Sequence, residues 1–118
     1  MSIRPELEKL WRSNKDIRTG DLEPLFIATV APRKPHNGAI LLTDVKLQST
    51  GEYMTDHVWL SPSWEAEPIY ELKNKATRKV YWGRQIAFTA QVRPYNWYSK
   101  EFGLVYTERG YWYVIEPS

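Results

Sequence analysis

Cationic and aromatic side chains share one stretch of the chain, where together they could bind phosphates and unpaired bases. Residues 75–100 carry six Lys or Arg residues and neither Asp nor Glu. Tyr95, Trp97 and Tyr98 lie close together near the end of this stretch. Cations neutralise phosphate groups, and aromatic rings stack on bases that are not paired. This composition is typical of a surface that binds single strands, although ordinary β-strands also reach it.

The adjacent residues Asp56 and His57 raise a second possibility, a catalytic site in which a carboxylate orients an imidazole. Adjacent residues of a strand point to opposite faces, so we do not expect the carboxylate to orient the imidazole. The chain has one other histidine, no cysteine, no glycine-rich phosphate loop and no nucleophile motif. Glu65, Glu67 and Glu71 could hold a divalent cation, but a solvated acidic surface is the simpler interpretation. We therefore predict no enzyme, no catalytic or metal-binding residue and no cofactor.

Length and charge limit the possibilities further. A chain of 118 residues supports one domain. The net charge of +2 is small, but residues 39–74 carry two cations against six acids, so the charge is unevenly distributed. No apolar run approaches the roughly 18 residues of a membrane span, and the N-terminus lacks a signal-peptide core. We expect a soluble, cytoplasmic protein with no membrane partner.

The clearest structural pattern is a strict alternation over residues 83–95. Its apolar positions are Ile86, Phe88, Ala90 and Val92, and its other positions are Gln85, Ala87, Thr89, Gln91 and Arg93. This period of two predicts a half-buried strand with one apolar face. Phe88 therefore belongs to the core and is not a base-stacking residue.

Other elements follow from similar patterns. Residues 1–15 predict an amphipathic helix with Pro5 in its first turn and Leu7, Leu10 and Trp11 on one face, followed by a polar linker over 15–23. Further strands are predicted over 25–30, 39–47, 54–60 and 103–115, and a short helix from Pro68. Asp44 indicates a bulge or an exposed turn of face, and Arg109-Gly110 a tight turn or a bulge.

The order of these elements is three strands, a helical connection and two more strands. This is the order of the OB-fold, a five-stranded Greek-key barrel. We therefore predict a mainly β, OB-like barrel over residues 25–118, preceded by a helix and linker over residues 1–24. An SH3-like barrel is the main alternative.

Asp56-His57-Val58-Trp59, residues 83–95 and Gly103-Leu104 together resemble small bacterial or mobile-element OB-fold proteins, over about residues 54–105. The resemblance implies the barrel. OB-folds bind single-stranded DNA, RNA, oligosaccharides or proteins, so it leaves the ligand open.

OB domains bind ligands on the face of strands 2 and 3, flanked by the loops after strands 1 and 4. Here these loops are 32–38, with Arg33, Lys34 and His36, and 95–102. His57 and Trp59 lie on one side of the third strand, opposite Val58 and Leu60, and are either on the binding face or covered by the N-terminal helix. The predicted nucleic-acid-binding residues are Arg33, Lys34, His57, Trp59, Arg93, Tyr95, Trp97, Tyr98 and Lys100.

We therefore expect a non-enzymatic domain that binds single-stranded DNA or RNA through basic loops and stacking aromatic rings. The alternative is a protein-interaction or assembly module, because Trp, Tyr and Arg also dominate protein interfaces.

Overall fold

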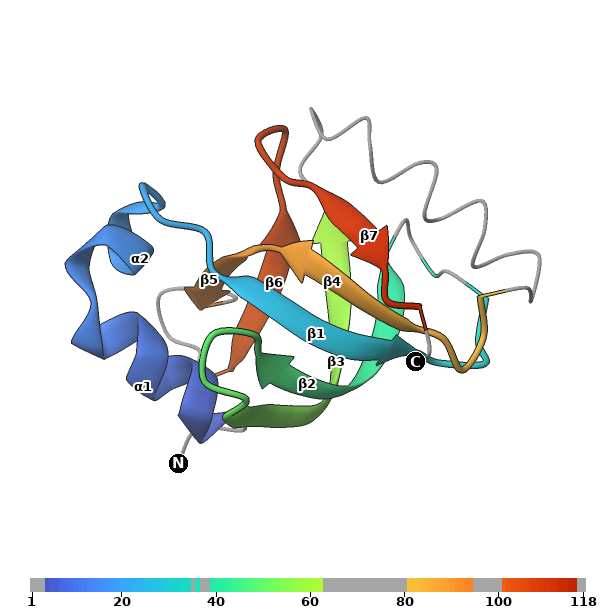
Figure 1. Cartoon of the computed structure of the whole chain (residues 1–118). Coiled ribbons are helices and arrows are strands. Elements are labelled where there is room, and N and C mark those ends of the chain that lie inside the picture. Colours follow the sequence, from blue (N-terminus) through green and yellow to red (C-terminus); the bar gives the residue numbers. More distant parts are fainter. Residues whose placement is uncertain (1–3, 35, 37–38, 63–80, 95–100, 117–118) are drawn as a thin grey trace.

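The computed structural model describes residues 4–34, 36, 39–62, 81–94 and 101–116 of the chain. It is a mainly β fold with a single seven-stranded sheet, in the order β5-β6-β3-β2-β1-β4-β7 (Figure 1). The elements are α1 (Pro5–Ser13), α2 (Lys15–Thr19), β1 (Leu25–Val30), β2 (Ile40–Leu47), β3 (Tyr53–Pro62), β4 (Gln85–Thr89), β5 (Gln91–Pro94), β6 (Phe102–Tyr106) and β7 (Trp112–Val114). Neighbouring strands are antiparallel except for β3 and β6, which are parallel.

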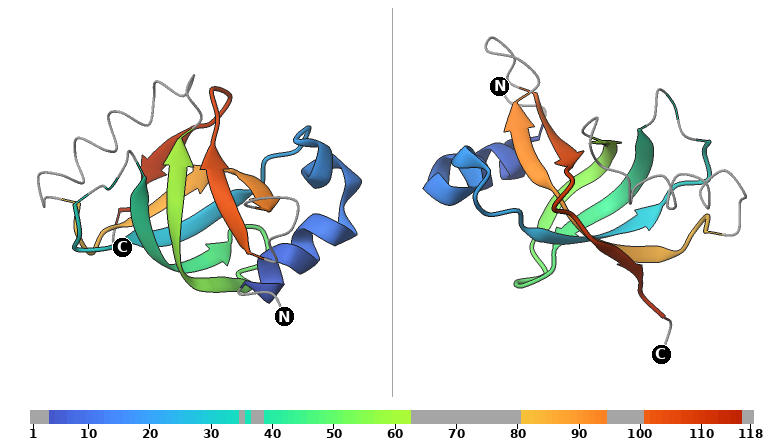
Figure 2. Two further views of the ribbon diagram at one scale, coloured as in Figure 1. Left: turned by 180° about the vertical axis from the view of Figure 1, so that it is seen from behind. Right: turned by 90° about the horizontal axis from the view of Figure 1, so that it is seen from above.

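The sheet is curled into a half-barrel because one stretch of chain contributes to two distant parts of it. Only Ala90 separates β4 from β5, yet β4 pairs with β1 while β5 pairs with β6. The backbone N–H of Ala90 donates to the carbonyl of Pro24, 3.2 Å away, just before β1. The strand predicted over this stretch is therefore divided at Ala90, where the chain leaves β1 and crosses toward β6 (Figures 1 and 2).

The inner face of this stretch is the one that the alternation predicted. Ile86, Phe88, Ala90 and Val92 are all at most 1% exposed and belong to one hydrophobic cluster. The outer face, however, is not solvated as a half-buried strand would be. Ala87, Thr89 and Gln91 are also buried, because neighbouring strands and the end of α2 cover them. That part of the prediction was wrong.

The helices close one end of the half-barrel (Figure 1). Pro5 occupies the first turn of α1, as predicted, and Leu7 is fully buried while Leu10 and Trp11 pack against the core. The Trp11 ring lies 5.4 Å from the ring of Phe102 on β6. The amphipathic helix predicted near the N-terminus is therefore present.

The polar linker predicted after this helix was partly wrong, since residues 15–19 form α2. The side chain of Asn14 accepts hydrogen bonds from the backbone N–H groups of Asp16 and Ile17, which satisfies the first turn. Gly20 ends the helix with a left-handed φ of 84°. Ile17 is 3% exposed and anchors this short helix in the core.

Two smaller predictions about the strands are confirmed. Asp44 has a φ of 51°, and the pairing of β1 with β2 skips a residue beside it, as a bulge requires. The N–H of Gly110 donates to the carbonyl of Thr107 at 2.9 Å, which closes a turn between β6 and β7. The short helix predicted from Pro68 lies outside the described residues.

Arg4 connects the two parallel strands at the point where they separate. Its Nε donates to the carbonyl of His57 at 3.2 Å and its Nη1 to the carbonyl of Phe102 at 2.9 Å. The residue is 8% exposed, and β3 and β6 pair directly only from Leu60 and Leu104 onward. The guanidinium thus gives the Phe102 carbonyl a donor and adds a second donor to the His57 carbonyl, which also accepts from Oγ1 of Thr55 at 3.1 Å.

We expect Arg4→Met to lower the free energy of unfolding by about 1–3 kcal/mol, because methionine fills the space but removes the donor to the Phe102 carbonyl and one of the two donors to the His57 carbonyl. Urea unfolding measures the loss. Arg12→Met is the matched control, since the Arg12 side chain is 68% exposed. Equal stability of the two variants would contradict this role for Arg4.

Candidate functional site

The outer face of β2 and β3 carries His57 and Trp59, as the alternation predicted. Val58 and Leu60 are fully buried on the inner face. The His57 side chain is 56% exposed, and Trp59 is half-buried. The N-terminal helix packs its apolar residues against the core cluster, so it does not cover His57. In register, Leu41 lies opposite Trp59 on β2.

His36 is a residue of this surface that the list of predicted site residues omitted. Its ring centroid lies 6.3 Å from that of Trp59, and the two planes are tilted by 59°. Two backbone hydrogen bonds between His36 and Ala39, of 3.0 and 2.9 Å, turn the loop back toward β2. The only sequence signal for His36 was its place in the predicted ligand loop.

Arg33 and Lys34 are exposed and follow β1 at this same end of the sheet. The N–H of Arg33 donates to the carbonyl of Ala31 at 2.8 Å, and the N–H of Ala31 donates to the carbonyl of Leu41 at 3.1 Å. The two cations therefore lie beyond the row that contains Leu41 and Trp59. We call Arg33, Lys34, His36, Leu41 and Trp59 the Trp59 surface.

Arg93 is exposed on the outer face of β5, because its neighbour Val92 points into the core. Arg93 pairs with Gly103 on β6, and Leu104 pairs with Leu60 on β3. It therefore lies on the other side of β6 from Trp59, at two strand spacings or about 10 Å. Tyr95, Trp97, Tyr98 and Lys100 lie outside the described residues and stay predictions.

The prediction that Asp56 could not orient His57 was wrong. Nδ1 of His57 lies 2.9 Å from Oδ1 of Asp56, and a carboxylate can only accept such a bond. The alternation breaks here, since Met54 and Thr55 are both buried and the next two residues are both exposed. A shift in the pairing of β2 with β3 allows this break.

The hydrogen bond from His57 is the main cause that lowers the pKa of Asp56. Desolvation and the nearby carboxylates of Asp56 and Asp44 raise the pKa of Tyr53. This part of the outer face is therefore acidic, in contrast to the cationic end at Arg33 and Lys34. Among the described residues, no group of three or more His, Asp or Glu side chains is placed to hold a metal ion.

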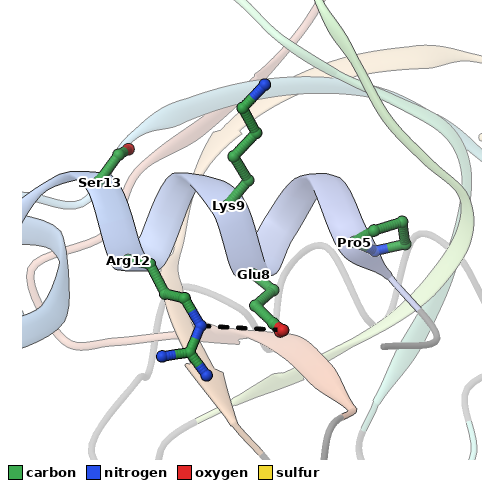
Figure 3. A pocket seen from close by; sticks show the side chains of 5 residues that line it. All are labelled: Pro5, Glu8, Lys9, Arg12 and Ser13. Carbon is green, nitrogen blue, oxygen red and sulfur yellow. Dashed lines mark ion pairs between the residues drawn. The ribbon is translucent and has the colours of Figure 1, made fainter. Parts of the chain in front are cut away.

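A separate hollow of about 510 Å³ lies over α1 (Figure 3). It is lined by Pro5, Glu8, Lys9, Arg12 and Ser13, and Nε of Arg12 lies 3.8 Å from Oε1 of Glu8. This hollow has no aromatic ring in its lining, and two of its three charged side chains, Glu8 and Arg12, pair with each other. It does not combine cations with stacking surfaces as the Trp59 surface does.

No protein family, curated protein or solved structure matches this chain. In the described part of the chain, no helix has the length and apolar character needed to cross a membrane.

Proposed function

We propose that the chain is an OB-like barrel that binds single-stranded DNA or RNA on the outer face of β2 and β3, without catalysis. If β4 and β5 are counted as one bent strand, five strands follow in Greek-key order, and β6 returns parallel to β3. This arrangement is compatible with an OB barrel to which β7 has been added. The OB ligand face then corresponds to the face that carries Trp59.

The observation that carries the proposal is the contact between His36 and Trp59. It joins the loop after β1 to the outer face of β3, two elements that flank the ligand in OB domains. The same loop presents Arg33 and Lys34 to solvent. A half-buried indole beside two exposed cations offers a base a stacking surface and its phosphates a counter-charge.

In this mechanism Arg33, Lys34 and Arg93 neutralise phosphates while a base stacks on Trp59. The tilted ring of His36 supports one side of the indole. Lys100, Trp97 and Tyr98 extend the site as sequence-based predictions. Recognition of this kind favours single strands, because duplex bases are not free to stack on a side chain.

We expect Trp59→Ala to weaken binding of a labelled single-stranded oligonucleotide by fivefold or more, since a stacked base contributes about 1–3 kcal/mol. Fluorescence anisotropy at low salt measures the affinity, and a thermal melt checks the fold. Trp59→Phe retains a stacking ring and should lose less. Preference for duplex over single strands would contradict the proposal. If the chain binds neither single-stranded nor duplex oligonucleotides, the proposal fails and the protein-interaction module is the remaining alternative.

A further inference from the structure

The outer face of the sheet beyond β2 is more apolar than a solvated antiparallel sheet requires. Such sheets usually place polar residues on the side facing water. On β1, Leu25 and Ile27 lie on the outer face and are half-buried, while Phe26 and Ala28 fill the core. None of the outward residues of β1, β4 and β7 is acidic. This face therefore lacks the carboxylates that would repel a phosphate chain.

Two tyrosines lie at the far side of this face. Tyr111 is 53% exposed and Tyr113 47% exposed, whereas Trp112 and Val114 pack against the core. Tyr111 directly precedes β7 and continues its pairing through hydrogen bonds with Thr89. The period of two along an extended chain therefore places the side chains of Tyr111 and Tyr113 on one face, about 7 Å apart.

The backbone beneath these rings is held firmly. The N–H of Tyr111 donates to Oγ1 of Thr89 and the N–H of Thr89 donates to the carbonyl of Tyr111, both at 3.0 Å. Tyr113 pairs in register with Ala87 on β4. A platform that is already ordered costs little conformational entropy when a ligand binds.

A continuous row of residues leads from this pair toward β2. Tyr113 is aligned with Ala87, Ala87 with Ile27, and Ile27 with Lys46. Ala87 is fully buried although it points outward, because the larger side chains of Ile27 and Tyr113 flank it. The row is a shallow apolar strip with the exposed cation Lys46 at its β2 end, where Lys46 pairs with Tyr53 on β3. Trp59 pairs instead with Leu41, so a ligand that joins Trp59 to the tyrosines crosses the sheet diagonally.

We infer that Tyr111 and Tyr113 form a second base-stacking platform, so that a single strand bound at Trp59 continues across β2 and β1 to β7. This inference rests on the proposed function. Trp59 and Tyr113 are four strand spacings apart across the sheet and four residues apart along the strands, because their rows meet β1 at Ala31, directly after its last residue, and at Ile27. This corresponds to about 24 Å along the sheet. Four stacked nucleotides span about 10 Å, at about 3.4 Å per step. An extended strand with twice that rise per nucleotide spans about 20 Å. Only longer ligands reach both platforms.

The test compares thymidine oligonucleotides of four and twelve nucleotides on the Tyr111→Ala/Tyr113→Ala double variant. We expect binding of the 12-mer to weaken by tenfold or more, as for the loss of stacked bases, and binding of the 4-mer to stay within twofold. Leu22→Ala is the control. Leu22 is 45% exposed, but it lies between α2 and β1 and outside this row of residues. It should not change either affinity.

Each other outcome is decisive. Unchanged binding of the 12-mer by the double variant would overturn the second platform. An equal loss of affinity for the 4-mer and the 12-mer would also overturn it, because the effect of the tyrosines would then not depend on the length of the ligand. If the unmodified chain binds neither oligonucleotide, the proposed function itself fails. This result differs from one in which the unmodified chain binds the 12-mer and the double variant binds it with the same affinity.

Discussion

Replacing Phe88 by alanine is expected to lower the free energy of unfolding by about 3–5 kcal/mol, the cost of removing a fully buried aromatic ring. Phe88 has no exposed surface, and its ring lies 5.8 Å from that of Phe26 in a stacked arrangement. It is paired with Phe26 on β1 and with Trp112 on β7. Three strands therefore meet around this side chain, and they cannot easily collapse into the space that it leaves.

Urea or thermal unfolding measures this loss, with Gln85→Ala as the control because Gln85 is exposed on the same strand. Thr89 looks like a neutral neighbour in the sequence but is not one. Its Oγ1 accepts a hydrogen bond from the N–H of Tyr111, and the residue is 6% exposed. We expect Thr89→Ala to cost about 1–2 kcal/mol. A loss below about 1 kcal/mol for Phe88→Ala would mean that this ring does not organise the core.

The face of Phe88 could be predicted because alternation requires only that one side of a strand be buried. What covers the other side is a long-range property. Ala87 and Thr89 are buried by pairing with β7, some 25 residues later in the chain. The division at Ala90 has the same origin, since the partners change there from β1 to β6.

Part of the candidate site could also be predicted. Arg33, Lys34 and Trp59 followed from a turn-rich basic loop and from the alternation of the third strand. The contact of His36 with Trp59 depends on how the loop folds back, and no local pattern encodes this. The pairing of Asp56 with His57 was missed because β3 carries one extra residue, Met54, in its pairing with β2, and this interrupts the alternation. Bulges of this kind are set by both strands together.

The second large effect is expected from reversing the two loop cations. Arg33→Glu/Lys34→Glu should weaken binding of single strands at 50 mM salt on the order of 50-fold, if each side chain neutralises one phosphate. Each lost contact should also lower the slope of log affinity against log salt by roughly 0.7. The double variant should therefore have a slope smaller by about 1.4. Anisotropy titrations over a series of salt concentrations give both numbers.

A change of net charge alone could slow association with any polyanion, so the control must carry the same change elsewhere. Lys9→Glu/Lys15→Glu meets this need, because both lysines are exposed on the helices at the other end of the half-barrel. Through-space repulsion is screened within about 10 Å at 0.1 M salt. The control should therefore lose little affinity at that salt concentration and keep its slope. Equal losses in the two double variants would show that phosphates are attracted by net charge, and the loop after β1 would then have no specific part in binding.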